Sequence, residues 1–155
     1  MRGVKVLLLG ACMLAFGAMW AQQKKEADKK AKPKPVPVYL GNSNYSNGDI
    51  SKHIFDSLLT QGLTSRDSAG NRYKVDGYLL TYGERNLYED SVGQLMVVTD
   101  YLSEVGYGDS LSSFLLNTLR DRSKKGDTVY FDQITVRDAT GKGFKGKGVK
   151  LVIQK

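Results

Sequence analysis

Few residues in this chain could perform chemistry, and they do not form a catalytic pattern. His53 is the only histidine and Cys12 the only cysteine. One histidine cannot build a multi-histidine metal site, and a Ser-His-Asp triad would have to use this single residue. His53 lies one step off the apolar stripe of a predicted helix, which indicates a partly solvated helix residue. The sequence therefore predicts no catalytic, cofactor-binding or metal-binding residues.

Carboxylates are the remaining catalytic candidates. The adjacent pair Glu89-Asp90 and the isolated Asp109 stand next to predicted turns and lack metal-ligand spacing. A glycine-rich basic stretch, 138–148, lacks the spacing of a phosphate-binding loop, and no helix follows it. We interpret that stretch as a flexible hairpin loop. A cell-envelope enzyme that uses carboxylates is kept as an alternative function.

Aromatic side chains are more abundant and suit contact better than catalysis. The chain has nine tyrosines and five phenylalanines, which provide large apolar area with a polar edge. Several tyrosines cluster in and after a predicted strand, 73–82. Alternate members can be buried in a sheet, or the cluster can present a binding face. We take Tyr78, Tyr82 and Tyr88 as the candidate interface.

The first 21 residues have the pattern of a secretory signal peptide. A short basic segment precedes an apolar run, 6–16, which is too short to span a bilayer. The boundary after Ala21 predicts a mature chain that begins at Gln22 in the periplasm. The residues before Cys12 look like a lipobox, so a lipoprotein anchored through Cys12 is the alternative. The apolar run continues past Cys12, which favours cleavage after Ala21.

Positive charge is concentrated in a tail and not in the predicted domain. The formal net charge of the whole chain is +7, but from Pro37 onward it is only +1. The segment 22–37 is rich in Lys and Pro, and we predict a disordered linker there. A solvated spacer is favoured over an electrostatic tether to anionic lipid. Nucleic-acid binders carry their basic surface on the fold, so no nucleic-acid partner is expected.

The rest of the chain, 38–155, predicts one α+β domain. We expect a mainly antiparallel sheet or sandwich of about five to six strands with two short helices. Helical spacing of apolar residues predicts a first helix, capped by Asp49 and stopped by Gly62. Ser110 is the predicted cap of a second helix, with Phe114 on its buried stripe. No stretch in this part is long and apolar enough to span a bilayer.

The predicted strands differ in how their apolar residues alternate. The segments 128–137 and 149–154 indicate a closing hairpin, with a bulge near Asp132-Gln133. In contrast, 95–102 has apolar residues on both alternation phases at its start. That pattern is typical of a strand covered on both faces.

Four short stretches carry a resemblance to a known family: 38–41, 48–52, 123–134 and 149–153. Together they resemble the C-terminal domain of GldM (PorM in some species). This family comprises the periplasmic shaft proteins of the gliding-motility and type IX secretion motor of Bacteroidetes. The resemblance covers 38–155 and is best in the closing hairpin. The segment 94–105 looks like an addition relative to the family domain.

The resemblance implies a non-catalytic periplasmic adaptor. In the family, the C-terminal domain contacts ring proteins at the outer membrane, so partners are expected among envelope proteins, including ring components of the type IX machinery. A homodimer is compatible with this interpretation. The family's membrane helix and other periplasmic domains have no counterpart in this sequence, which predicts that the chain does not itself use a proton gradient. An unrelated surface-associated structural protein is a further alternative.

Overall fold

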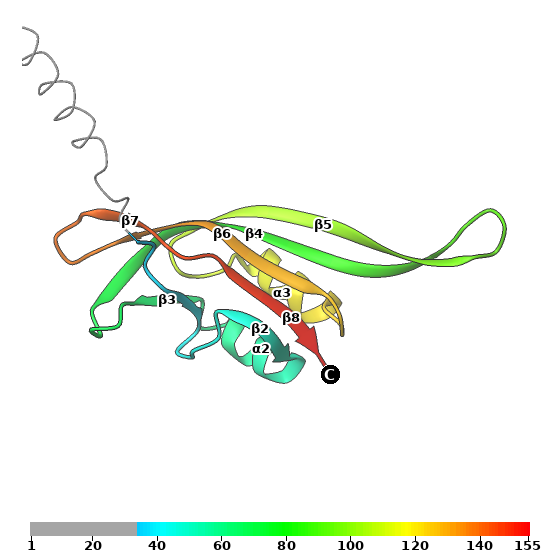
Figure 1. Ribbon diagram of the computed structural model, residues 1–155, viewed down its shortest axis with the longest axis horizontal. Helices are drawn as coiled ribbons and strands as arrows, with labels where there is room; N and C mark the ends of the chain where they lie inside the picture. Colours follow the sequence, from blue (N-terminus) through cyan, green and yellow to red (C-terminus); the bar gives the residue numbers. More distant parts are fainter. Residues whose placement is uncertain (1–33) are drawn as a thin grey trace, which may run out of the picture. The chain divides into compact units, whose positions relative to one another are not determined.

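The computed structural model describes residues 34–155, which form a mostly β structure with two helices (Figure 1). The predicted α+β class with two short helices is confirmed. In chain order the elements are β1 (Val38–Leu40), β2 (Asn47–Ser51), α2 (Lys52–Leu59), β3 (Leu63–Arg66), β4 (Arg72–Glu89), β5 (Leu95–Tyr107), α3 (Ser113–Arg122), β6 (Thr128–Arg137), β7 (Gly143–Lys145) and β8 (Val149–Gln154).

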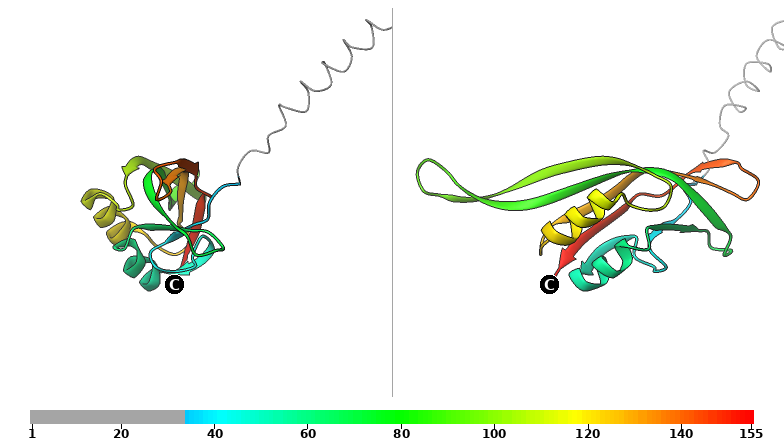
Figure 2. Two further views of the ribbon diagram at one scale, coloured as in Figure 1. Left: turned by 90° about the vertical axis from the view of Figure 1, so that its left-hand side faces the viewer. Right: turned by 180° about the vertical axis from the view of Figure 1, so that it is seen from behind.

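The strands form one curled sheet in the order β1-β3-β4-β6-β8-β2. Neighbouring strands are antiparallel except β2 and β8, which are parallel. Two further strands lie off this path, since β5 pairs with β4 and β7 pairs with β6. The sheet is therefore mainly antiparallel, as expected, with two strands more than the six of the main path. Both helices lie on the same side of the strands in the end-on view of Figure 2.

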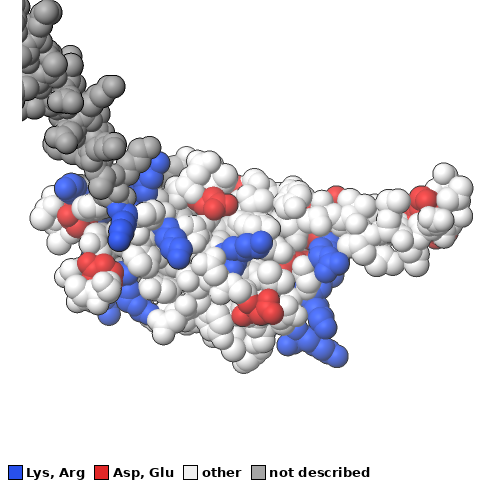
Figure 3. Space-filling view, in the orientation of Figure 1, with Lys and Arg blue, Asp and Glu red and all other residues white. Residues whose placement is uncertain are grey.

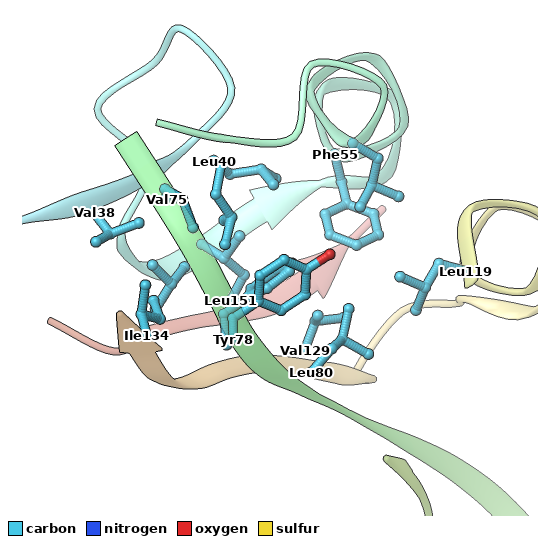
Figure 4. Close-up of a cluster of buried hydrophobic side chains, with 14 of the residues drawn as sticks. Val38, Leu40, Phe55, Val75, Tyr78, Leu80, Leu119, Val129, Ile134 and Leu151 are labelled. Carbon is cyan, nitrogen blue, oxygen red and sulfur yellow. The ribbon is translucent and has the colours of Figure 1, made fainter. Parts of the chain in front are cut away.

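The core fills the space between this sheet and the helices (Figure 4). Phe55 and Leu59 enter it from α2, and Leu115 and Leu119 from α3, each at most 1% exposed. Burial of such side chains contributes about 1.5–3 kcal/mol each, which stabilises short helices that would not form alone. The buried residues of the sheet that meet them include Val38, Leu40, Val75, Tyr78, Leu80, Val129, Ile134 and Leu151.

The predicted bulge in β6 is present. Gln133 has a φ of +50°, and Gly77 pairs with Thr135 while Leu79 pairs with Asp132. Two residues of β6 therefore stand opposite one residue of β4. The extra residue turns Ile134 back to the core face, where it is 1% exposed, although strict alternation would send it to the opposite face.

Both helices begin later than predicted. Asp49 is not a cap, because β2 continues through Ser51 and pairs with β8 along its whole length. That pairing buries Ile50 in the sheet, whereas its spacing predicted a position in the helix. In α3 the cap is Ser112 and not Ser110, since the Ser112 hydroxyl accepts a hydrogen bond from the Leu115 N–H at 3.2 Å. Phe114, placed on the buried stripe by its spacing, is 62% exposed.

The glycine-rich stretch after β6 is a hairpin, as predicted, and contains the short strand β7. The Asp138 carboxylate accepts hydrogen bonds from the N–H groups of Thr140 at 2.8 Å and Lys142 at 3.0 Å. These bonds shape the turn without a ligand.

The signal peptide, the cut after Ala21, the lipidated Cys12 alternative and most of the linker lie outside the described residues. The folded part already includes Val36, which was assigned to the linker. Val36 is 7% exposed, and its N–H donates to the Lys145 carbonyl at 2.9 Å. The folded part therefore includes residues before Val38. Among the residues that the structure describes, no helix meets the length and hydropathy of a membrane span.

Candidate functional site

A β-hairpin that projects from the body is the most distinctive surface feature of the described residues (Figure 1). The last pair between β4 and β6 is Gly83 with Thr128. From Glu84 to Glu89, β4 pairs only with β5. We call the segment Glu84–Asp100 the arm. Six residues of strand reach about 20 Å beyond the end of β6.

Exposed large apolar side chains are concentrated on this hairpin. Ten of the twelve in the described residues lie on β4 and β5 or the turn between them. Contiguous apolar surface of this kind marks interaction sites in soluble proteins. The ten are Leu87, Tyr88, Val92, Leu95, Met96, Val97, Val98, Tyr101, Val105 and Tyr107.

The prediction that 95–102 is covered on both faces is wrong for this chain alone. Leu95 is 68% exposed and Val97 is 53% exposed on one face, while Met96 is 47% exposed on the other. The pattern of apolar residues was recognised correctly, but the cover is absent because β5 runs past the end of the body. Apolar residues on both phases of β5 are therefore exposed on both faces of the arm.

The odd-numbered residues of β5 lie on one face of the hairpin, which we call the outer face. This face carries a stripe of apolar residues that continues from the tip onto the body. Gly83 faces Tyr101 across the β4–β5 ladder, and a Cβ at Gly83 would lie 3.1 Å from the Tyr101 ring. The missing side chain leaves room for the ring to lie across the neighbouring strand. Beyond Tyr101 the stripe reaches Val105 and Tyr107, beside a shallow depression of about 280 Å³.

The inner face of the arm's base is polar and fixed to the end of α3. Asp100 accepts hydrogen bonds from the Asn86 amide at 2.9 Å and the Tyr88 hydroxyl at 3.0 Å. The hydrogen bond from Asn86 has the largest effect and that from Tyr88 the next, and together they hold the pKa of the Asp100 carboxyl below its usual value. Glu84 forms ion pairs with Arg122 and, at 3.5 Å, with Lys124. The arm is therefore braced at its base and uncovered at its tip.

The three predicted interface tyrosines share one face of β4 but have different surroundings. Tyr78 is 3% exposed and Tyr82 is 1% exposed, so both belong to the core. Tyr88 is 47% exposed, because its position lies beyond Thr128 at the end of the ladder with β6. Only Tyr88 can meet a partner without rearrangement of the core. The residues that sequence reasoning missed are those of β5, whose signal was its apolar run on both phases.

The candidate catalytic residues do not converge. Asp90 shapes the turn at the tip of the arm, where its carboxylate accepts from the N–H groups of Val92 at 2.9 Å and Gln94 at 2.8 Å. Glu89 is exposed beside it, while Asp109 and His53 are exposed elsewhere on the body. Within residues 34–155 no group of three His, Cys, Asp or Glu side chains is placed to hold a metal ion.

Tyr78 gives the fold a dependence on alkaline pH. Its hydroxyl donates to the Ser110 carbonyl at 3.0 Å, and burial, with Glu104 and Asp109 nearby, raises its pKa to about 12. The neutral phenol is thus favoured in the folded state. Its stabilisation is complete below the unfolded pKa of 10.0 and is lost as the pH rises toward 12.

We expect the urea midpoint to fall between about pH 10 and pH 12, and Tyr78→Phe to make that fall shallower. Tyr107→Phe is the matched control, because Tyr107 is 84% exposed. An equal slope in Tyr78→Phe and wild type would contradict the assignment. Urea unfolding followed by circular dichroism at each pH measures it.

Comparison with known proteins gives no match for this chain, either among protein-family models or among curated proteins.

Proposed function

We propose that this chain is a non-catalytic protein-binding module of the cell envelope, and that it binds its partner through the arm. The observation that carries this proposal is the concentration of exposed apolar side chains on a braced hairpin. A braced arm loses little conformational freedom on binding, which favours affinity. The scattered carboxylates and the solitary histidine give no comparable support to catalysis.

The chemistry of the arm defines the kind of partner. Its two faces offer Leu87, Leu95 and Val97 on one side and Tyr88 and Met96 on the other. Aromatic residues and methionine are enriched in protein interfaces. Figure 3 shows Lys and Arg over the body and mostly uncharged surface along the arm, on the face in view. A protein with an apolar groove or strip fits this surface better than a polyanion does.

The predicted export and the sequence resemblance supply the cellular setting. The expected signal peptide places the mature chain in the periplasm. The resemblance to the GldM C-terminal domain suggests an adaptor role with outer-membrane-associated ring components of the type IX machinery. The arm includes most of the segment that looks like an addition to that domain, which would give this adaptor its own partner.

The test is quantitative capture from envelope extract of the native host. We expect Leu87→Ser combined with Leu95→Ser to reduce capture of the partner at least tenfold, since each buried leucine contributes about 1.5 kcal/mol or more. Phe114→Ser is the matched control, because Phe114 is equally apolar and exposed but lies on α3. Equal capture by the arm variant and wild type would contradict the proposal.

The same material tests the enzyme alternative. Glu89→Gln with Asp90→Asn removes both tip carboxylates, while the asparagine keeps an oxygen for the turn. We expect this pair to bind the partner as wild type does and to show no change in turnover of envelope polysaccharide and peptide substrates. Wild-type turnover that the pair eliminates would replace the binding module with an enzyme.

A further inference from the structure

The outer edge of β5 is a free strand edge over its whole length. Among the described residues, β5 pairs with β4 alone, and their register from Gly77–Tyr107 to Glu89–Leu95 has no shift. Natural edge strands are usually protected by Lys, Pro or bulges. The sequence of β5 contains no Pro, Lys or Arg. A regular edge of 13 residues with no bulge, Pro or Lys is a template for another strand.

The turn fixes which backbone groups point away from β4. The Asp90 N–H donates to the Gln94 carbonyl at 2.9 Å, so these two residues form a hydrogen-bonded pair. Pairs of the two types alternate along an antiparallel ladder. The odd-numbered residues from Leu95 to Tyr107 therefore direct their N–H and C=O groups to the free edge. Their side chains form the outer stripe.

We propose that a second copy of this chain pairs with this edge, β5 against β5 in antiparallel order, with Tyr101 on the two-fold axis. In this register Val97 faces Val105 of the second copy, and Thr99 faces Ser103. Each of these residues has outward-pointing backbone groups, so the pairs close complete hydrogen-bonded rings. The inference goes beyond the proposed function and depends on the backbone of β5 instead of the side chains of the arm.

The acidic residues of β5 select this register. With Tyr101 on the axis, Asp100 faces Leu102 and Glu104 faces Val98. A slide of two residues in one direction places Asp100 opposite its own copy, and in the other direction opposite Glu104. Like charges directly opposite are destabilising. A slide of one residue places outward-pointing backbone groups opposite inward-pointing ones, which cannot bond.

Charge and size also suit a second copy. The arm holds four carboxylates and one arginine, a net charge of −3, whereas the other residues from Lys34 onward sum to +5. Antiparallel pairing keeps the two acidic tips at opposite ends of the dimer, far from each other. A strip about 43 Å long and 10 Å thick covers on the order of 900 Å² over both copies, which is the size of a weak, reversible interface.

Cross-linking tests the register in the full chain carrying Cys12→Ser. Tyr101→Cys should give a covalent dimer on oxidation, because directly paired Cα atoms are about 5.5 Å apart. Thr99→Cys is the matched control on the same face, since its two copies would be four residues, about 13 Å, apart. Cross-linking of Thr99→Cys as fast as Tyr101→Cys would overturn the proposal.

Sedimentation tests the pairing without a cysteine. The wild-type chain should show a concentration-dependent monomer–dimer equilibrium, and Thr99→Pro should weaken the dimer at least tenfold. Proline at this position removes an outward N–H and leaves the ladder with β4 intact. Thr99→Ala is the control that should dimerise as wild type does. A wild-type monomer at every concentration, or a Thr99→Pro dimer of wild-type affinity, would overturn the proposal.

The results of these dimerisation tests can be separated from the result of the partner-capture test. Thr99→Pro keeps Leu87, Leu95 and the other tip side chains, and circular dichroism with urea unfolding checks that it folds. Loss of the dimer in Thr99→Pro together with unchanged partner capture supports both proposals. Partner capture that fails in wild type leaves the sedimentation result unaffected.

Discussion

Replacing Phe131 with alanine is expected to lower the free energy of unfolding by about 3–5 kcal/mol, a large share of the stability of a domain of this size. Phe131 lies in the middle of β6 and is 0% exposed. Its ring meets that of Tyr78 edge to face, with the centroids 5.5 Å apart. Truncation removes this contact and leaves a cavity next to the bulge of β6. The irregular backbone there limits how far neighbouring residues can move to fill the cavity.

Phe114 provides the matched control for this substitution. It is a phenylalanine of the same chain but 62% exposed on α3, so Phe114→Ala should change the free energy of unfolding by about 0.5 kcal/mol or less. Urea denaturation at constant m-value measures both variants. Comparable losses in the two variants would mean that Phe131 does not occupy the core position described here.

The closing hairpin was predictable because its burial follows local alternation. Val149 to Gln154 alternate between one buried face and one open face, and this period is written in the sequence. Thr128 to Arg137 was predicted with the same bounds. Even its bulge could be anticipated, because the phase of the apolar residues changes once between Phe131 and Ile134.

The starts of the helices were not predictable from local spacing. Ile50 has the period of the first helix, yet it lies in β2 opposite Ile153. The parallel pairing of β2 with β8 joins the beginning and the end of the domain. A single sequence does not specify such a long-range contact, and tertiary pairing overrides the weak helical propensity of one turn.

The site was only partly predictable, because the sequence encodes apolarity but not cover. Tyr78, Tyr82 and Tyr88 fall on one face of one strand, and the end of β6 decides which of them is buried. Likewise, the apolar run of β5 has the pattern of a buried strand, and only the structure places it beyond the body. The same pattern can therefore be covered within one chain or between two chains.

Replacing Asp127 with alanine is expected to destabilise the domain by about 3 kcal/mol, because three donors lose their acceptor at once. Asp127 is 0% exposed. Its carboxylate accepts from the Tyr82 hydroxyl at 2.7 Å, the Arg85 N–H at 2.8 Å and the Lys124 N–H at 2.9 Å. Burial of the Tyr82 phenol and its hydrogen bond to Asp127 both raise its pKa, so the phenol stays protonated and remains a donor.

Smaller changes separate these bonds from one another. Tyr82→Phe removes one donor and leaves the backbone bonds, so it should cost about 1–1.5 kcal/mol. Asp121→Ala is the matched control, because Asp121 is exposed on α3 and should change stability by about 0.5 kcal/mol or less. Urea denaturation ranks the three variants. An Asp127→Ala variant as stable as Asp121→Ala would contradict the assignment.

The same variant connects stability with the arm. Arg85 stands at the root of the arm, and its N–H is held by Asp127 at the turn between α3 and β6. Loss of this bond should loosen the arm before the rest of the sheet. The two strands of the arm pair only with each other, and among the described residues the Arg85 N–H is the one backbone group of the arm that is bonded to the body. Amide hydrogen exchange in Asp127→Ala should accelerate most in residues 84–100, whereas Phe131→Ala should accelerate exchange throughout the core. Uniform acceleration in both variants would show that Asp127 stabilises the body alone, and the arm's direction would then depend on the ion pairs of Glu84 with Arg122 and Lys124.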